Sequence, residues 1–387
     1  MSKISRILFY SHDTFGLGHI RRTQKLANTI SREDRAILIA CASPKASSFG
    51  SLPGIEYLNL PGFTKQVTGE YVPRSLPLHL EEFINLRAGL LLSAVRSFDP
   101  DIFVIDKEPL GVKRELIPSL EFLKFHQKRC HVICGFRDIL DEPEAVEREW
   151  HRRDTVDALQ TYFHSIFVYG EKETFDFEKE YPFAASLQTK FKYLGFLPPD
   201  DTNQISEFSI PFADATKPLV TLTLGGGGDG QEILEATQRL LGSRSHLDFN
   251  LYILTGPFSS PLIQMQLKQL TENRPEVYVT DFIANSLQLF RQSQLILCMG
   301  GYNTMTELMH LQKYPLILPR VKPRKEQLLR AQSFQRLGLC DYLPPENLSA
   351  ESLFQKITEL LEREPKIIKA LPMRGLKSFA QYIEGLL

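Results

Sequence analysis

Residues 219–241 read LVTLTLGGGGDGQEILEATQRLL, an apolar run that ends in four glycines before a helical pattern begins. The apolar run is short and rich in Leu, Val and Thr, so it predicts a buried β-strand. Four glycines allow a tight turn that exposes backbone N–H groups beside the positive end of the following helix, where an anion binds well. The stretch therefore predicts strand, phosphate-binding turn and helix in succession. A tight turn without a ligand is the alternative.

The same alternation of apolar strand and helix-length segment continues along both halves of the chain. In the first half we expect strands at Ile7–Ser11, Ala36–Ala42, Ile55–Leu60, Asp101–Asp106, His131–Phe136, Ser165–Gly170 and Phe191–Gly195. In the second half we expect them at Leu219–Gly225, Leu251–Gly256, Val277–Phe282, Leu295–Gly300 and Pro315–Arg320. Continuous apolar strands separated by helices are typical of a parallel sheet that is covered on both faces.

A segment rich in Pro and Asp, without strand or helix period, separates the two halves. We therefore expect an α/β protein with two doubly wound, Rossmann-like domains at residues 1–198 and 218–387, joined by a linker at 199–217. The last helix is a candidate for packing back on the first domain. Because ligands bind outside the carboxyl ends of parallel strands, we expect the domains to face each other across a cleft between those ends.

Composition excludes several classes of protein. The 387 residues include 45 basic and 46 acidic ones, and this balance argues against a dedicated nucleic-acid-binding protein. No apolar run approaches the length of a membrane span, and the N-terminus MSKISRILFYSHD lacks the apolar region of a signal peptide, so we expect a cytoplasmic protein. Five cysteines are too few for a disulfide framework, and we expect Cys130 and Cys134 to be buried free thiols.

Two glycine turns in the second half carry candidate binding residues. The first contains Gly225, Gly226, Gly227, Gly228, Asp229 and Gly230. It lacks the Lys of a P-loop, and the next strand ends without the acid that holds a ribose in nicotinamide-binding folds. The second turn has Gly300 and Gly301, and Asn303 and Thr304 after them suit a helix start and phosphate oxygens. Glu307, about one turn further on, can accept ribose hydroxyls or simply complement the helix dipole.

The segment RVKPRKEQLLR at 320–330 has five basic residues and one acid in an almost neutral chain. It follows a strand end beside the two glycine turns, which favours a place near a phosphorylated ligand. A solvated helix face is the alternative. Glu326 and Gln327 are suited to a polyhydroxylated partner.

In the first half, SHDTFGLGHIRR at 11–22 places Gly16, Gly18 and His19 between the first strand and the first helix. His19 is the candidate general base, because its ordinary pKa is near 6.5 and a helix N-terminus disfavours its charged form. A histidine that merely packs the turn is equally consistent with the sequence. Asp106 and Lys107 end a later strand and can orient an acceptor or the histidine, or form a surface pair.

Together, FGLGH, LGGGGDG, VYVTDFIANSLQLFRQSQLILCMGGYNTMTEL and KPRKEQLLRAQSFQRLG resemble the MurG-like family of bacterial lipid-linked N-acetylglucosaminyltransferases, a branch of the GT-B glycosyltransferases. The resemblance covers most of the second half in order and spacing, but only the first turn of the first half. It implies the GT-B architecture. The chain departs from the family in having Glu326 where a second amide is usual, and in its first domain after the first helix.

The resemblance also implies roles for single residues. Residues Gly225–Gly230 and Asn303–Thr304 would hold the donor diphosphate, and Phe282 and Ile283 would flank the base. Glu307 would bind the ribose, Glu326 and Gln327 would contact the donor sugar, and His19 would be the general base toward the acceptor.

These expectations combine into a glycosyltransferase that moves a sugar from a nucleoside-diphosphate-sugar, a UDP-sugar, to an acceptor hydroxyl, with inversion and without metal or cofactor. The alternatives are a non-hydrolysing nucleotide-sugar 2-epimerase and a nucleotide-sugar-binding protein without catalysis. The acceptor is open, and a lipid-linked molecule is one candidate. We further expect weak contact with the inner membrane surface through residues 63–80, with Lys65 and Arg74 facing anionic lipid.

Overall fold

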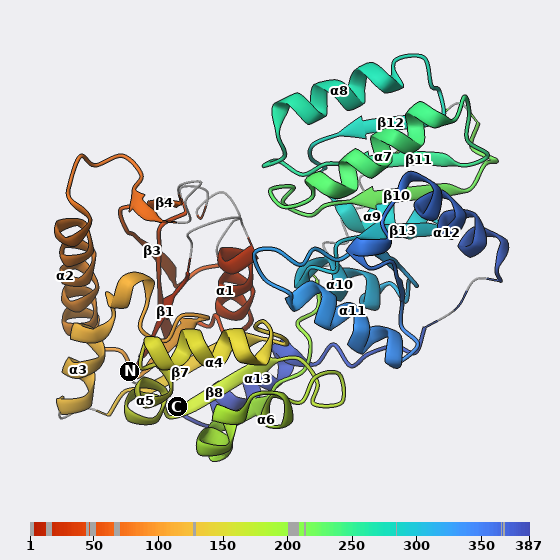
Figure 1. Cartoon of the computed structure of the whole chain (residues 1–387). Helices are drawn as coiled ribbons and strands as arrows, with labels where there is room; N and C mark the ends of the chain where they lie inside the picture. The colour runs from red at the N-terminus through yellow and green to blue at the C-terminus, as the bar shows by residue number, and fades with distance from the viewer. Residues whose placement is uncertain are drawn as a thin grey trace. The chain divides into compact units, whose positions relative to one another are not determined.

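The computed structural model describes residues 4–12, 18–43, 46, 52–65, 70–126, 129–199, 209–212, 214–283, 285–364, 366 and 368–387. The chain divides into two compact units (Figure 1), the first formed by residues 1–197 with 373–387 and the second by residues 198–372. Residues 200–208 and 213 of the expected linker lie outside the described residues.

The first unit contains a seven-stranded parallel sheet in the order β3-β2-β1-β6-β7-β8-β9. Its strands are β1 (Ser5–Tyr10), β2 (Arg35–Cys41), β3 (Ile55–Asn59), β6 (Ile102–Asp106), β7 (His131–Arg137), β8 (Ser165–Tyr169) and β9 (Phe191–Tyr193). Its helices are α1 (Gly18–Thr29), α2 (Leu80–Phe98), α3 (Ile117–Phe125), α4 (Pro143–Arg152), α5 (Thr155–Tyr162), α6 (Phe177–Glu180) and α13 (Gly375–Glu384). Every residue of β6 and β8 is buried, which explains the continuous apolar pattern of these strands.

The order of the first sheet reverses between β1 and β6, because the chain builds β1 to β3 toward one edge and then continues from β6 toward the other. Right-handed crossovers place the helices of the two halves on opposite faces of such a sheet. In such sheets the loops that follow the two strands at the reversal diverge to opposite faces. Ligands of doubly wound sheets bind at this point, outside the carboxyl ends of the strands.

The final helix, α13, belongs to the first unit although it follows the whole second unit in the chain (Figure 1). Phe379 of α13 packs against Phe9 of β1 and Phe167 of β8, with ring centroids 6.3 and 5.9 Å apart. The hydroxyl of Tyr382 lies 2.5 Å from Ser165 Oγ.

The second unit repeats the arrangement with six parallel strands in the order β12-β11-β10-β13-β14-β15. The strands are β10 (Leu219–Thr223), β11 (Asn250–Leu254), β12 (Val277–Thr280), β13 (Leu295–Cys298), β14 (Leu316–Ile317) and β15 (Asp341–Tyr342). The helices are α7 (Gln231–Ser243), α8 (Pro261–Thr271), α9 (Ser286–Gln292), α10 (Tyr302–His310), α11 (Glu326–Arg336) and α12 (Ala350–Glu362). Here the order reverses between β10 and β13. The predicted α/β class with two doubly wound sheets is confirmed.

Some sequence expectations need correction. The strand expected at Pro315–Arg320 is only two residues long, and β15 was not predicted, because two-residue strands carry too little pattern to detect. The stretch 63–80, for which no strand was expected, contains a small antiparallel hairpin of β4 (Phe63–Lys65) and β5 (Tyr71–Pro73). Phe63 is buried there against Phe83 of α2.

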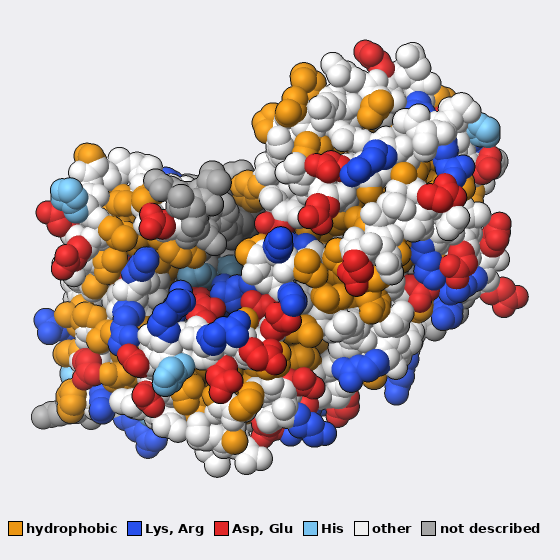
Figure 2. All heavy atoms as spheres, viewed as in Figure 1, with side chains coloured by type: hydrophobic (Ala, Val, Ile, Leu, Met, Phe, Trp, Pro, Cys, Tyr) orange, Lys and Arg blue, Asp and Glu red, His pale blue; other side chains and the backbone are white. Residues whose placement is uncertain are grey.

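Other expectations agree with the structure. All five cysteines are buried free thiols, as predicted for Cys130 and Cys134. Acidic and basic side chains are interspersed on the face that Figure 2 shows, without a large area of one sign. In the part of the chain that the structure describes, no helix is both long and apolar enough to cross a membrane.

Candidate active site

The candidate residues gather at the two points where strand order reverses. In the first unit, His19 follows β1 and Asp106 ends β6. In the second unit, one glycine turn follows β10 and the other follows β13. Parallel neighbouring strands end at the same edge, so each pair is brought together although the members are 75 and 87 residues apart.

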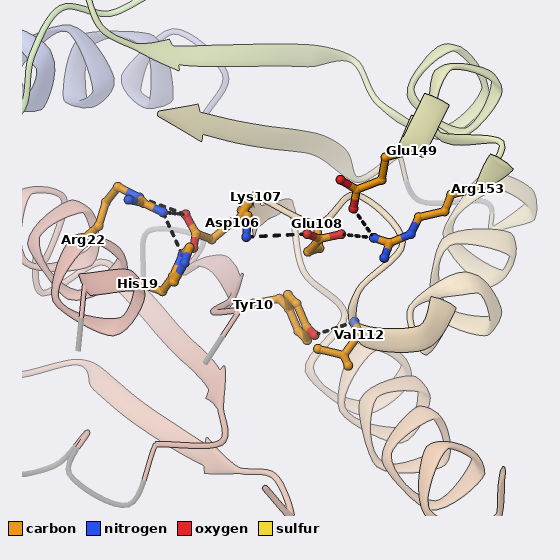
Figure 3. A network of polar contacts seen from close by, with 9 residues as sticks. All are labelled: Tyr10, His19, Arg22, Asp106, Lys107, Glu108, Val112, Glu149 and Arg153. Carbon is orange, nitrogen blue, oxygen red and sulfur yellow. Dashed lines mark hydrogen bonds and ion pairs between the residues drawn. The ribbon is translucent and has the colours of Figure 1, made fainter. Parts of the chain in front are cut away.

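His19 and Asp106 are in direct contact (Figure 3). His19 Nδ1 lies 2.6 Å from Asp106 Oδ2, and only 14% of the His19 side chain and 7% of the Asp106 side chain are exposed. The other carboxylate oxygen, Oδ1, accepts hydrogen bonds from Nε and Nη2 of Arg22, at 2.9 and 2.5 Å. Arg22 lies three residues after His19 on α1, so both side chains leave the same face of the helix.

This contact determines which nitrogen of His19 carries the proton. Burial alone would raise the pKa of Asp106, but Arg22 and His19 outweigh burial and hold the pKa well below its usual range, so the carboxyl is ionised. An ionised oxygen 2.6 Å from Nδ1 requires a hydrogen between the two atoms, so Nδ1–H donates to Asp106. The lone pair of His19 then resides on Nε2, which is the atom that a general base needs.

The surroundings keep the imidazole neutral at physiological pH. Burial is the main cause that lowers the His19 pKa to about 4; Asp106 opposes burial, while Arg22 and Lys107 act with it. His12 lies next to it at the end of β1, with ring centroids 5.5 Å apart, and burial also lowers the His12 pKa well below the ordinary value. The helix N-terminus that we expected to depress the pKa is thus not the leading cause.

A chain of ion pairs continues from Lys107 along the same edge (Figure 3). Lys107 Nζ lies 3.8 Å from Glu108 Oε1, and Arg153 Nη1 lies 3.2 Å from Glu108 Oε2 and 2.9 Å from Glu149 Oε1. Lys107 has a φ of 67°, a left-handed conformation that a lysine seldom adopts. Directly after Asp106, this backbone turn holds the lysine charge beside His19.

The first glycine turn of the second unit uses its glycines in two ways. Gly227 is buried with a φ of 84°, and a Cβ there would collide with the carbonyl oxygen of Thr255, so this glycine permits the turn to pack on the loop after β11. Gly225 and Gly228 are exposed, and a Cβ on either would meet no atom within 4 Å. The exposed part of the turn leads directly into α7, whose N-cap is Gly230.

The second turn is built similarly at the start of α10. Gly300 has a φ of 79° and Gly301 is the N-cap of the helix, while Asn303 in its first turn is exposed. Arg330 of α11 is buried and donates to the Gly300 carbonyl at 2.7 Å, which fixes the turn from behind. Thr304, next to Asn303, is half-buried.

Glu307 is brought to the loop that follows β12. It is half-buried on α10, and its Oε2 accepts a hydrogen bond from Ser286 Oγ at 3.3 Å. Ser286 begins α9, three residues after Ile283 and four after Phe282. Phe282 is 54% exposed, an unusual position for a phenylalanine in a soluble domain.

Arg320 connects the first glycine turn to the start of α11. Arg320 Nε lies 3.0 Å from Asp229 Oδ2, and its Nη2 lies 2.9 Å from Glu326 Oε1. The backbone N–H of Arg320 donates to Gln327 Oε1 at 3.2 Å. Because Arg320 and Arg330 are both engaged inside the unit, the charge at 320–330 available to a ligand is smaller than the sequence suggests.

The structure therefore groups His19, Gly18, Asp106 and Lys107 at one edge, and the two glycine turns, Asp229, Glu326 and Gln327 at the other. Gly16 lies outside the described residues. Arg22 and Ser286 were not predicted from the sequence; for Arg22, the available signal was a charged residue one turn after His19 on the same helix face. Among the described residues, no group of three or more potential metal ligands is present.

Comparison with known proteins shows which family the second half of the chain resembles. Residues 221–384 match the profile of the glycosyltransferase family 28 C-terminal domain. The match begins in β10 and includes both glycine turns, Glu307 and the Arg320 cluster.

Two curated relatives also match this chain in sequence. Both are named UDP-N-acetylglucosamine–N-acetylmuramyl-(pentapeptide) pyrophosphoryl-undecaprenol N-acetylglucosamine transferase. The one from Streptococcus uberis is 32% identical over 158 residues, 40% of each chain. The one from Alkaliphilus metalliredigens is 20% identical over 375 residues, 95% of this chain and 94% of the relative. The match to the Streptococcus uberis relative thus spans two fifths of its length, whereas the more distant one extends over nearly the whole chain.

Solved structures show the fold. MurG from Acinetobacter baumannii superposes with a TM-score of 0.57 at 12% identity, covering 98% of this chain and 95% of that one. A putative UDP-N-acetylglucosamine 2-epimerase from Listeria monocytogenes gives a TM-score of 0.64 at 12% identity, covering 100% and 98%. The GT-B fold and the MurG-like resemblance expected from the sequence are confirmed.

Proposed function

We propose that this protein transfers a sugar from a UDP-sugar to the hydroxyl of an acceptor, with inversion at the anomeric carbon and without a metal. The observation that carries the proposal is the buried contact of 2.6 Å between His19 Nδ1 and Asp106 Oδ2. It leaves Nε2 as a proton acceptor at the point where the strand order of the first sheet reverses. The family 28 domain at 221–384 supports a nucleotide-sugar as the donor.

In the proposed reaction, Nε2 of His19 takes the proton of the acceptor hydroxyl while its oxygen attacks C1 of the donor sugar. The bond between C1 and the diphosphate oxygen breaks, and the diphosphate leaves with the electron pair. Asp106 stabilises the imidazolium that forms, because its carboxylate already accepts the Nδ1 proton.

The second unit would bind the donor. The exposed glycines at 225 and 228 and the start of α10 offer backbone N–H groups and the positive ends of two helices to the diphosphate. Glu307 would accept the ribose hydroxyls, and Phe282 and Ile283 would flank the uracil. Glu326 and Gln327 would reach the donor sugar only by giving up part of their contact with Arg320.

The acceptor side is proposed to include Gly18 and Lys107 beside His19. The curated relatives are named for a lipid-linked acceptor, and we propose an acceptor of this kind, reached by weak contact with the inner membrane surface. A nucleotide-sugar 2-epimerase is the second candidate, because the Listeria monocytogenes structure has the same fold over its whole length.

The test uses the full chain with UDP-N-acetylglucosamine as the donor probe. Released UDP and the sugar products are measured with no acceptor, with soluble glycosides and with polyprenyl-diphosphate-linked sugars. UDP release that needs an acceptor, together with a new glycoside, supports the transferase. Epimer formation without acceptor supports the epimerase. Donor binding without any product supports a binding protein, and absence of both binding and turnover with several UDP-sugars contradicts the proposal.

A further inference from the structure

We infer that Arg22 is a positioning residue, which shares the Asp106 carboxylate with His19 and thereby holds the imidazole as an uncharged base with its proton on Nδ1. The inference rests on the proposed role of His19 as general base.

The three side chains form a closed, buried set (Figure 3). One carboxylate oxygen of Asp106 lies 2.6 Å from His19 Nδ1, and the other accepts hydrogen bonds from Nε and Nη2 of Arg22, at 2.9 and 2.5 Å. Arg22 is 3% exposed, and its guanidinium carbon lies 5.9 Å from the centre of the buried Tyr169 ring, so it is held from β8 as well. The Nη2 atom is also 2.9 Å from His19 Nδ1.

Counting charges shows what Arg22 changes. With Arg22 present, the set is neutral when His19 is neutral, and carries one positive charge when His19 is protonated. Without Arg22, the set would carry one negative charge with neutral His19 and none with protonated His19. Buried groups avoid an uncompensated charge, so the arginine reverses the preferred state of the imidazole.

The other charged groups around His19 do not replace Arg22. His12 faces it from the end of β1 and is itself disfavoured as a cation by burial. Lys107 follows Asp106 on β6, and its charge is shared with Glu108, which also pairs with Arg153 between α4 and α5. Lys107 and Arg22 both lower the His19 pKa, and Arg22 also donates two hydrogen bonds to the carboxylate that opposes them.

Arg22 also fixes the direction in which the base points. Since Nε and Nη2 of Arg22 both donate to Oδ1, only Oδ2 is left for His19, and the carboxylate cannot rotate without losing two hydrogen bonds. A Lys at this position would keep the charge but not the paired donors. The two contributions of Arg22, charge and orientation, are thus separable by substitution.

The experiment is an NMR titration of the full chain with ¹⁵N-labelled histidine, comparing wild type with R22Q and R22K. The His19 signals are assigned by their loss in H19Q. In the wild type we expect a midpoint near pH 4 and the Nδ1–H tautomer. R22Q keeps one hydrogen-bond donor to Asp106 but removes the charge, so its midpoint should rise by at least about one pH unit, a tenfold change in proton affinity. R22K should stay close to the wild-type midpoint.

The matched control is R21Q, at the exposed neighbouring arginine of the same helix turn, which should leave the His19 midpoint unchanged. An unchanged midpoint in folded R22Q, an Nε2–H tautomer in the wild type, or a rise in R22K as large as in R22Q would each overturn the inference. If R22Q fails to fold, R22K decides: a wild-type midpoint supports the role of charge, and a raised one contradicts it. None of these readouts requires turnover, so loss of the inference is distinct from a failure of the transferase assay.

Discussion

At the carboxyl edge of the first sheet the candidate groups are buried, ion-paired side chains, whereas at the same edge of the second sheet they are mainly backbone turns. His19, Arg22 and Asp106 are all engaged with one another. The glycines at 225 and 228 are instead exposed, and a Cβ on either would meet no atom within 4 Å. Both sets lie where strand order reverses. The same topology would therefore support the two proposed kinds of chemistry, which are proton transfer by side chains whose charge is set by burial and anion binding by N–H groups that need no charge.

This comparison predicts that substitutions at the two edges have different effects. A side-chain substitution in the first unit should impair the chemical step and leave donor binding intact. A Cβ added at a packed glycine of the second unit should impair binding and folding.

The largest effect is expected for His19→Ala. Loss of the general base should lower kcat about 10²- to 10⁴-fold. UDP affinity should stay within about twofold, because His19 belongs to the first unit and the glycine turns to the second. Steady-state kinetics with a UDP-sugar and calorimetry with UDP measure the two quantities. An equal fall in both would mean that His19 is structural and that the comparison does not hold.

The second prediction concerns pH and folding. The His19 pKa is about 4 in the folded protein and 6.5 in a model peptide, so between these values the unfolded chain binds more protons. Stability contributed by neutral His19 is therefore complete above pH 6.5 and is lost as pH falls toward 4, by about 3 kcal/mol in total. Asp106, whose folded pKa is depressed, adds a further loss only at more acidic pH.

Denaturant unfolding at pH 7.5 and pH 4.5 tests this for wild type and His19→Gln. The variant should lose less stability on acidification, because the folded pKa values of His12 and the half-buried His131 are lowered in both proteins, whereas His19 is present only in the wild type. Parallel losses would show that His19 is protonated equally in folded and unfolded states.

The third prediction concerns the glycine turn. Gly227→Ala should lower the free energy of unfolding by about 3 kcal/mol and weaken UDP binding, because Gly227 has a φ of 84° and no space for a Cβ. Gly228→Ala is the matched control, since a Cβ there meets no atom within 4 Å. It should change stability by less than about 0.5 kcal/mol. Similar effects of the two substitutions would contradict the division of the glycines into packing and open positions.

A smaller effect is expected for Glu307→Ala, which should weaken UDP binding by about 1–3 kcal/mol, the cost of a lost partner for buried polar groups. Ser286 would lose its acceptor as well. The control is Glu362→Ala, an exposed acid at the end of α12. Calorimetry that gives wild-type affinity for Glu307→Ala would remove this residue from the proposed donor site.

The candidate site of the second unit could be predicted from the sequence more fully than that of the first, because it consists of backbone turns and not of side chains from distant segments. The glycine turns are local: strand, glycines and helix start are contiguous at 219–241, so the pattern predicted their place at the end of β10. The sequence also suggested that Asp106 can orient His19, which the contact between them agrees with. Such a contact depends on β1 and β6 being neighbours, and on their register, which short-range pattern does not contain.

The ion-pair partners of the candidate residues were even harder to predict from the sequence. In the sequence, Arg22 resembles any surface arginine of an amphipathic helix, and only the structure shows its ion pair with Asp106. Likewise, the basic run at 320–330 reads as a positive surface, but Asp229 and Glu326 neutralise Arg320, and Arg330 is buried against Gly300. Charge counts along the chain fail where ion pairs form between distant segments.

The smallest expected effect concerns the acceptor, and it extends the comparison from the two edges to the surface of the first unit. The segment after β5 exposes Leu76 and Leu78, and Arg74 follows the hairpin directly; Leu86 and Leu90 of α2 are also partly exposed. Exposed leucines beside a basic residue suit weak, reversible contact with anionic lipid, to which each basic side chain contributes about 1 kcal/mol at low salt.

Co-sedimentation with vesicles containing anionic lipid should therefore show binding that falls with salt and falls further in a Lys65→Glu, Arg74→Glu variant. The control variant Arg239→Glu, Lys268→Glu changes net charge equally in the second unit and should bind as the wild type does. No binding at low salt, or equal loss in the two variants, would mean that the first unit has no lipid-facing segment at 63–80, and would favour a soluble acceptor for the base at His19.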